Sequence, residues 1–359
     1  MFQHDAMSLG ETIAAIQPPD EAAERAARAR LDSLTKPPGS LGRLEEIVAR
    51  YAACRGDGSA RMGRGAILVF VADHGVAEAG VSAYPQAVTV EMLRNIGAGG
   101  AAISVLARRF GYDLRVTDVG VATDTSLTPF AGVTYARVGT GTKNFLSGPA
   151  MTQAQARRAL EVGIESARST AAARATLIGI GEMGIANSTS AAALLALTTG
   201  LAPAQLVGRG TGVDDTGLQR KVAAVEAAIA RHRAAAGNGI DLLAAVGGFE
   251  LAAMAGACLG AAAARAPIVV DGFIATAAAA VAIKIAPQAR DYMFFSHRSA
   301  EGGHALALRS LAAAPMLDLG MRLGEGTGAA LAMNLVESAL ALFHQMATFA
   351  SAGVSGKLE

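Results

Sequence analysis

The feature of the sequence that most constrains the fold is a series of short, unbroken apolar runs, each followed by a glycine or polar residue and then by an alanine-rich stretch. β-Branched residues are frequent in these runs, and apolar residues do not alternate with polar ones. Unbroken runs are typical of strands buried on both faces of a parallel sheet. The runs occupy residues 66–75, 114–120, 175–184, 267–273 and 292–297.

The alanine-rich stretches between the runs predict helices. Two examples are residues 191–198 and 274–285, which follow the third and fourth runs. Their small side chains would let these helices approach the sheet closely. The repeated order of strand, loop and helix therefore predicts an α/β fold, with a doubly wound, mainly parallel sheet flanked by helices.

The two ends of the chain have a different pattern. Residues 20–52 read as helical, apart from a break at residues 36–42 that contains Pro and Gly. Residues 329–350 place apolar side chains at helical spacing. We expect both ends to form a small helical lobe laid over the α/β domain. This predicts an N-terminal segment, an α/β domain and a C-terminal helix at residues 1–60, 61–325 and 326–359.

The longest apolar stretch, residues 242–264, is not expected to span a membrane. It contains Glu250 and the pair Gly247-Gly248, and alanine is more frequent in it than leucine. A spanning helix needs ~20 strongly apolar residues. We predict instead a helix packed tightly inside a globular protein.

Charge and cysteine content exclude several classes of protein. The chain has 31 basic and 30 acidic side chains, whereas a protein that binds nucleic-acid phosphates needs a basic domain. Cys54 and Cys258 cannot form a disulfide framework, so we expect reduced thiols. The first residues lack the order of a secretory signal. These features predict a soluble, cytoplasmic protein with no nucleic-acid or membrane partner.

Polar residues at the ends of the predicted strands are the first candidates for a site. Ligands of open α/β sheets bind beyond the carboxyl ends of the strands. A carboxylate there can equally cap a helix or hold a turn, so both interpretations stay open. The candidates are Asp73, His74, Asp118, Glu182, Asp271, Ser296 and His297.

Residues 179–184 fit the pattern GxGxxG between a predicted strand and a helix, as in dinucleotide-binding folds. That fingerprint also requires an acid ~20 positions later, and residues 201–206 contain none. A nicotinamide-dinucleotide oxidoreductase therefore remains only an alternative. Asn187 and Ser188 open the following helix, where free amides favour an anion. Ordinary capping by either side chain explains them equally well.

Two more glycine-rich loops are candidates. Residues 207–212 include Gly210, and Lys221 follows as a possible counter-charge for a ligand. In residues 323–328, Glu325 lies between glycines directly before a long apolar helix. Those glycines would let a planar ligand approach the carboxylate, which suits a general base.

The histidines and cysteines do not indicate a metal site. The six histidines show neither HxH nor HExxH spacing, and neither cysteine has a histidine nearby in the sequence. We therefore expect neither a metal nor a cofactor.

A series of segments, in order over roughly residues 30–350, resembles the family of nicotinate-nucleotide:dimethylbenzimidazole phosphoribosyltransferases. Any one segment is modest support, whereas the ordered set is specific. The segments are residues 36–45, 72–76, 181–187, 246–250, 271–273, 296–301 and 321–329.

The resemblance implies a reaction. Members of this family transfer the phosphoribosyl group of nicotinate mononucleotide to 5,6-dimethylbenzimidazole, giving α-ribazole 5′-phosphate and nicotinate for the lower ligand of cobalamin. It also implies a parallel α/β domain with a small lobe from both chain ends, assembled as a homodimer.

The resemblance also implies roles for particular residues. Glu325 corresponds to the general base, and Glu182 to a second acid that orients the donor or eases positive charge on the ribose. The residues implied to hold the nucleotide phosphate and ribose are Gly184, Thr189, Gly210 and Ser299, and Lys221 matches a family lysine at the site. Those implied to line the pocket for the base are Tyr84, Met92, Met183 and Leu323. Further expected substrate-binding residues are Asn187, Asp271 and Gly324.

Tyr84 and Met92 depart from the family pattern, in which a small polar residue precedes the proline and an amide lies further along. The acceptor could therefore be another azole, a purine or a phenol. A nucleotide-sensing protein with the same loops is a non-enzymatic alternative.

Overall fold

The computed structural model describes residues 7–123, 125 and 129–355. Its described part contains a six-stranded, all-parallel sheet in the order β3-β2-β1-β4-β5-β6. The strands are β1 (Arg64–Ala72), β2 (Asp113–Gly120), β3 (Val133–Tyr135), β4 (Ala175–Met183), β5 (Ile268–Val270) and β6 (Met293–Phe295).

Each predicted run contains a strand, and the predicted α/β class is confirmed. β3 was not predicted because it is a short, partly exposed edge strand without an apolar run. β1 pairs with β2 on one side and β4 on the other, so the strand order reverses at β1. Such a switch point leaves a crevice at the carboxyl ends of the strands.

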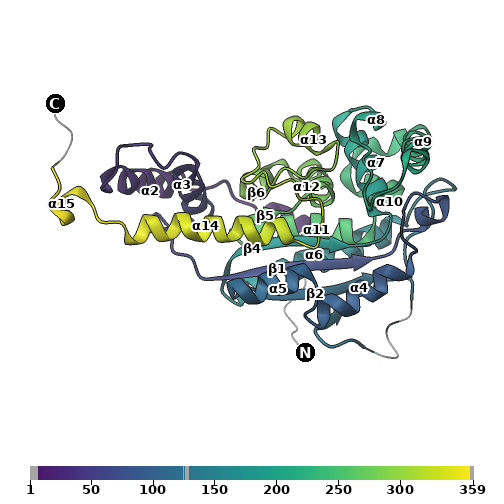
Figure 1. Ribbon diagram of the computed structural model, residues 1–359, viewed down its shortest axis with the longest axis horizontal. Helices are drawn as coiled ribbons and strands as arrows, with labels where there is room; N and C mark the ends of the chain where they lie inside the picture. The colour runs from purple at the N-terminus through teal and green to yellow at the C-terminus, as the bar shows by residue number, and fades with distance from the viewer. Residues whose placement is uncertain (1–6, 124, 126–128, 356–359) are drawn as a thin grey trace.

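Helices cover both faces of the sheet (Figure 1). α4 (Ala87–Gly97), α5 (Ala102–Phe110) and α14 (Thr327–Gln345) cover one face, and α6 (Gln153–Ala172) and α11 (Phe249–Ala263) cover the other. α6 and α11 pack closely, since a β-carbon at Gly163 or Gly256 would overlap the backbone of the facing helix. Small residues thus let these two helices pack against each other, in addition to the close approach to the sheet that was expected.

The apolar stretch at residues 242–264 forms two helices, so the prediction of one helix was wrong. α10 (Gly239–Val246) ends where Gly247 and Gly248 adopt extended backbone, and α11 then begins at Phe249. α11 is buried along almost its whole length. Within the described residues, no helix is both long enough and apolar enough to cross a membrane.

A further group of helices packs together above the sheet in the view of Figure 1. They are α7 (Asn187–Thr199), α8 (Pro203–Leu206), α9 (Asp215–His232), α12 (Phe273–Ile285) and α13 (His304–Ser310). Short 3₁₀ helices lie at η1 (Gly75–Ala79), η2 (Arg233–Gly237) and η3 (Pro287–Tyr292).

The two chain ends form the predicted helical lobe. Figure 1 shows α2, α3 and α15 beside the far end of α14. Leu34 pairs with Thr348, and Arg30 Nε donates to the Phe343 carbonyl at 3.0 Å. The division of the chain at residues 60 and 325 stays a prediction. The helices of the ends are α1 (Leu9–Ala15), α2 (Glu21–Ser33), α3 (Arg43–Arg55) and α15 (Phe349–Ala352).

Candidate active site

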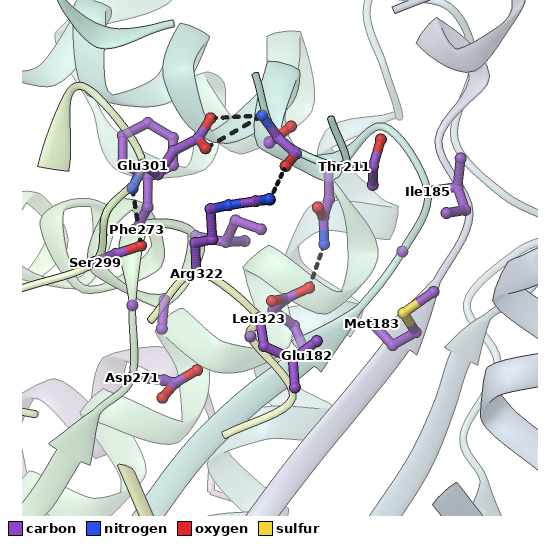
Figure 2. Close-up of a pocket in the computed structure, with 18 of the residues that line it drawn as sticks. Glu182, Met183, Ile185, Thr211, Asp271, Phe273, Ser299, Glu301, Arg322 and Leu323 are labelled. Carbon is purple, nitrogen blue, oxygen red and sulfur yellow. Dashed lines mark hydrogen bonds between the residues drawn. The ribbon is translucent and has the colours of Figure 1, made fainter. Parts of the chain in front are cut away.

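A cavity of about 390 Å³ opens at the carboxyl ends of β4, β5 and β6 (Figure 2). Its walls are the first turns of α7 and α12 and the loops near residues 210, 300 and 323. Most of the residues expected at the site meet here, although they are far apart in the sequence. Those that line the cavity are Tyr84, Glu182, Met183, Gly184, Asn187, Gly210, Asp271, Ser299, Leu323 and Gly324.

Four of the site residues that the resemblance implied do not line this cavity, and neither do the strand-end candidates Asp73, His74, Asp118 and Ser296. Lys221 is buried behind its wall, where Nζ donates to Ser188 Oγ at 3.0 Å and to the Gly208 carbonyl at 2.9 Å. Thr189 is buried in the first turn of α7. Met92 lies on α4, and Glu325 is buried beside the cavity-lining Gly324.

The glycine pattern at residues 179–184 does not form a dinucleotide loop. Gly179 and Gly181 lie inside β4, where a β-carbon at Gly181 would come within 2.2 Å of the Gly326 amide nitrogen. These glycines let the start of α14 approach the sheet, so that interpretation of the pattern was wrong. Gly184 follows the strand and does line the cavity.

Neither Asn187 nor Ser188 caps α7. The cap position is Ala186, in left-handed backbone at φ +74°, and no described side chain bonds to the cap amides. Asn187 instead donates its side-chain amide to Glu182 Oε2. Gly272 precedes α12, which likewise has no side-chain cap in the described chain. The N-termini of α7 and α12 therefore face the cavity without side-chain caps from the described residues, although the Asn187 and Thr189 amides of α7 bond the carbonyls of Gly184 and Ala186. The positive end of a helix dipole favours anions.

Glu182 forms part of the cavity wall (Figure 2). Burial raises the pKa of its carboxyl group well above the ordinary range, and the nearby charges of Glu250 and Asp271 raise it further. The hydrogen bond from Asn187 opposes this rise in pKa. The structure thus brings a readily protonated acid to the cavity.

Asp271 binds the start of α14 as well as lining the cavity. Oδ1 accepts from the Ala329 amide at 2.8 Å, and Oδ2 accepts from the Gly326 amide at 3.2 Å. Burial raises the pKa of Asp271 to about 7, although the backbone amides oppose it. Both oxygens are engaged by backbone, so one part of this residue's role is to hold the loop that carries Glu325.

Glu325 has an unusual backbone conformation. Its φ is +63°, between Gly324 at +89° and Gly326 at +87°. Glycine was expected on either side of Glu325 to let a planar ligand approach. The backbone supplies a second reason, because glycine adopts the left-handed conformation of these residues without strain. Burial raises the pKa of Glu325, and the Ile103 amide opposes that rise. Oε2 has no hydrogen-bond partner among the residues described.

Several lining residues were missed as site residues. Arg322 donates to the Gly210 carbonyl at 3.1 Å, and Glu301 accepts from the Gly210 amide at 3.0 Å (Figure 2). Both residues lie inside the segments that resemble the family, and this position was the only sequence signal that could have identified them as site residues. His297 also lines the cavity. Its position directly after β6 made it a candidate, but no local motif assigned it a role.

Comparison with known proteins shows the family of this chain. A family model described as "Phosphoribosyltransferase" matches residues 16–354. The chain belongs to this phosphoribosyltransferase family. It is 48% identical over 351 residues to a protein of Roseiflexus sp. RS-1 named nicotinate-nucleotide–dimethylbenzimidazole phosphoribosyltransferase, covering 98% of this chain and 99% of that protein. A Chloroflexus aurantiacus protein of the same name is 50% identical over 347 residues, covering 97% of this chain and 98% of that protein.

Solved structures agree with the phosphoribosyltransferase assignment. A crystal structure of nicotinate-nucleotide–dimethylbenzimidazole phosphoribosyltransferase from Thermus thermophilus aligns with a TM-score of 0.88 at 47% identity, covering 94% of this chain and 100% of that chain. A second structure from that organism, named CobT, aligns with a TM-score of 0.89 at 48% identity, with the same coverage. The predicted resemblance and fold are therefore confirmed, and nothing in these comparisons favours the oxidoreductase alternative.

Proposed function

We propose that this phosphoribosyltransferase transfers the phosphoribosyl group of nicotinate mononucleotide to 5,6-dimethylbenzimidazole, giving α-ribazole 5′-phosphate and nicotinate for cobalamin. The observation that carries the proposal is the cavity beside β4, β5 and β6. It combines two helix N-termini that have no side-chain cap among the described residues, and Arg322, with the buried acid Glu182. This combination suits a substrate with anionic groups at its ends and a positive centre between them.

The phosphate of the donor fits the wall formed by α7 and the Gly210 loop. Gly184, Ser188 and Gly210 line that wall, and a glycine leaves room for close approach of a phosphate. Amides at a helix N-terminus bind anions well. The buried ammonium of Lys221 lies directly behind, bonded to Ser188 Oγ at 3.0 Å. Lys221 thus acts on the phosphate chiefly by holding this wall and adding positive charge.

The reaction needs little acid catalysis. The bond between C1′ and the cationic pyridine nitrogen breaks, and its electron pair returns to the nitrogen, so nicotinate leaves without a proton. Positive charge builds on the ribose, where Glu182 stabilises it once the cationic pyridine ring of the bound donor has lowered the pKa of this acid and ionised it. A benzimidazole nitrogen then bonds to C1′ from the opposite face, which inverts β to α.

The acceptor must lose the proton of its other ring nitrogen, and Glu325 is the base proposed to take it. A raised pKa makes a carboxylate a better proton acceptor, provided that it is ionised. The free Oε2 of Glu325 supports this role, because no described residue competes for it. Holding the two rings on opposite sides of C1′ supplies much of the remaining rate enhancement.

Tyr84 and Leu323 are proposed to contact the acceptor. Both line the cavity, and 55% of Tyr84 and 58% of Leu323 is exposed. A flat apolar ring would cover this exposed surface. The same surface would suit another azole, a purine or a phenol, and these acceptors are the alternatives to dimethylbenzimidazole.

Release of nicotinate from its mononucleotide, followed in the presence of dimethylbenzimidazole, tests the proposal. We expect release that depends on the acceptor, together with formation of α-ribazole 5′-phosphate. Glu21→Gln is a suitable control, since its exposed pair with Arg25 on α2 lies outside the cavity and should leave turnover unchanged. No release with any azole, purine or phenol would exclude the transferase function. Tight binding of a nicotinamide dinucleotide would favour the oxidoreductase alternative, and binding without turnover would favour a nucleotide sensor.

We also propose that the protein is a cytoplasmic homodimer, on the basis of the family resemblance and the reduced cysteines Cys54 and Cys258. The mass measured by light scattering during size-exclusion chromatography tests the dimer. Fractionation of cells tests the location.

A further inference from the structure

His297 is a buried histidine held tightly beside the cavity. It follows β6 and is 2% exposed. Its ring lies against Gly272, where a β-carbon would be 3.3 Å from Cε1, and against Gly328, where a β-carbon would overlap Nδ1. The ring therefore has little freedom to turn, and the orientation of its two nitrogens is set by the fold.

The hydrogen bonds around Ser296 assign the proton on His297. Ser296 Oγ is 2.8 Å from the Asp271 carbonyl oxygen, which can only accept, so the hydroxyl donates its single proton there. Ser296 Oγ is also 3.0 Å from His297 Nδ1. Because the hydroxyl proton is already used, Nδ1 must be the donor in this contact. Nδ1 of His297 therefore carries a hydrogen.

The other nitrogen, Nε2, is then a hydrogen-bond acceptor. Burial lowers the pKa of His297, with a smaller opposing effect from Asp318, so the ring is neutral near pH 7 and Nε2 keeps its lone pair. Nε2 has no hydrogen-bond partner in the described part of the chain, although the residue lines the cavity. An acceptor on a cavity wall that has no partner in the protein is available to a ligand or water that supplies a donor.

The neighbouring groups cannot take this role. Both oxygens of Asp271 are engaged by the amides of Gly326 and Ala329. His304 accepts the Ser299 amide at Nδ1 and bonds Thr276 through Nε2, so neither of its nitrogens is free. On this wall, Nε2 of His297 is thus the acceptor that remains available among these groups.

We propose that Nε2 of His297 accepts a hydrogen bond from a ribose hydroxyl of the donor nucleotide and so positions the ribose for transfer. The inference rests on the proposed function, because that function places a ribose in this cavity. A hydroxyl is the donor that a ribose offers, and an imidazole lone pair is a matching acceptor. Fixing the ribose would align C1′ between the leaving and attacking nitrogens.

Two substitutions separate this role from a structural one. His297→Asn keeps a donor near the position of Nδ1 for Ser296 but removes the acceptor at Nε2. His297→Gln places an amide oxygen near the position of Nε2, and this oxygen can accept a hydrogen bond from the ribose hydroxyl. Binding of nicotinate mononucleotide, measured by calorimetry without acceptor, should weaken about fivefold to tenfold in H297N and recover in H297Q.

The 2′-deoxy and 3′-deoxy forms of the mononucleotide identify the hydroxyl. We expect the wild-type protein to bind one of the two deoxy forms about fivefold to tenfold more weakly than nicotinate mononucleotide itself. H297N should bind that deoxy form and nicotinate mononucleotide with equal affinity. Discrimination that persists in H297N, or wild-type affinity in H297N, would overturn the role of His297. A wild-type protein that binds no nicotinate mononucleotide would overturn the proposed function as well, so the two failures are distinguishable.

Nitrogen NMR of histidine-labelled wild-type protein gives a readout that does not depend on folding of a variant. The Nε2 resonance of His297 should have the position of an unprotonated nitrogen and should shift on addition of the mononucleotide. The form lacking the bonded hydroxyl should not shift it. A protonated Nε2, or an equal shift with both deoxy forms, would contradict the proposal.

Discussion

The Oδ1 atom of Asp271 accepts a hydrogen bond from the Ala329 amide at 2.8 Å, which ties the end of β5 to the first turn of α14. Its Oδ2 atom accepts from the Gly326 amide of the same turn. Glu325 lies directly before Gly326, in left-handed backbone. A buried acid from one strand thus sets the position of the proposed base on a distant segment.

The raised pKa of Asp271 predicts that stability falls as the pH rises. Burial raises its pKa from 3.8 to about 7 in the folded protein, so between these values the folded state holds a proton that the unfolded state has lost. The free energy of unfolding should therefore decrease from about pH 4 to about pH 7 and then level off. The raised pKa values of Glu182 and Glu325 act in the same direction.

Urea denaturation at several pH values measures this effect. The side chain of Asp271→Asn cannot titrate. The total fall in the free energy of unfolding across this pH window should therefore be smaller in the variant than in the wild type, by up to about 4 kcal/mol. The pKa of Glu45 is lowered by its contacts with Lys36 and Leu41 despite burial. This residue therefore makes the free energy of unfolding rise with pH, but it does so equally in the wild type and the variant and cancels in the difference. Equal slopes in the wild type and the variant would contradict a raised pKa at Asp271.

Gly181→Ala should destabilise the fold where α14 meets the sheet. The added β-carbon would lie 2.2 Å from the Gly326 amide nitrogen, so α14 or β4 must shift. Overpacking of this kind costs about 1–3 kcal/mol. Gly148→Ala is the matched control, since no heavy atom lies within 4 Å of its new β-carbon. Thermal unfolding of the two variants makes the comparison, and equal midpoints would argue against the close approach.

Glu325→Gln should lower kcat by about 10²–10⁴-fold, as loss of a general base does. Binding of nicotinate mononucleotide should change little, because the substitution removes a proton acceptor and leaves the donor cavity in place. Glu337→Gln is the control: this residue lies on α14 as well, and burial also raises its pKa. Steady-state kinetics with both variants, together with donor calorimetry, tests the role of Glu325. It would be disproved by turnover in E325Q within a few fold of E337Q.

Donor binding should release a proton from Glu182. The pKa of this buried acid is raised well above its ordinary range, and the positive pyridine ring of a bound donor would lower it. Calorimetry at about pH 6 in two buffers of different ionisation enthalpy counts the released protons. The donor phosphate exchanges the same number of protons with the wild type and with Glu182→Gln. The difference in proton release between the two proteins therefore comes from Glu182. Identical proton release in E182Q would rule out this origin.

Much of the architecture could be predicted from the sequence because a segment that is buried has a recognisable pattern of apolar residues. An apolar run such as residues 66–75 predicts a strand covered on both faces, and the residue that follows it is placed at the carboxyl edge. Glu182 and His297 were found as candidates in this way. β3 left no such record because an edge strand of three residues is only partly buried.

Other features were decided only by the tertiary structure. Gly179 and Gly181 match a phosphate-binding pattern, yet they lie inside β4 and make room for α14. Glu301 and Gly210 are bonded at 3.0 Å, although 91 residues separate them in the chain.

The amino-acid sequence by itself thus determined the buried strands and most of the helices, and which polar residues end those strands. The tertiary structure decided which of those residues meet, which atoms are already bonded, and which atom, such as Nε2 of His297, is left for a ligand. The physical reason is that periodicity reflects the burial of each segment separately. Hydrogen bonds and clashes depend on distances between segments, and these arise only when the whole chain packs.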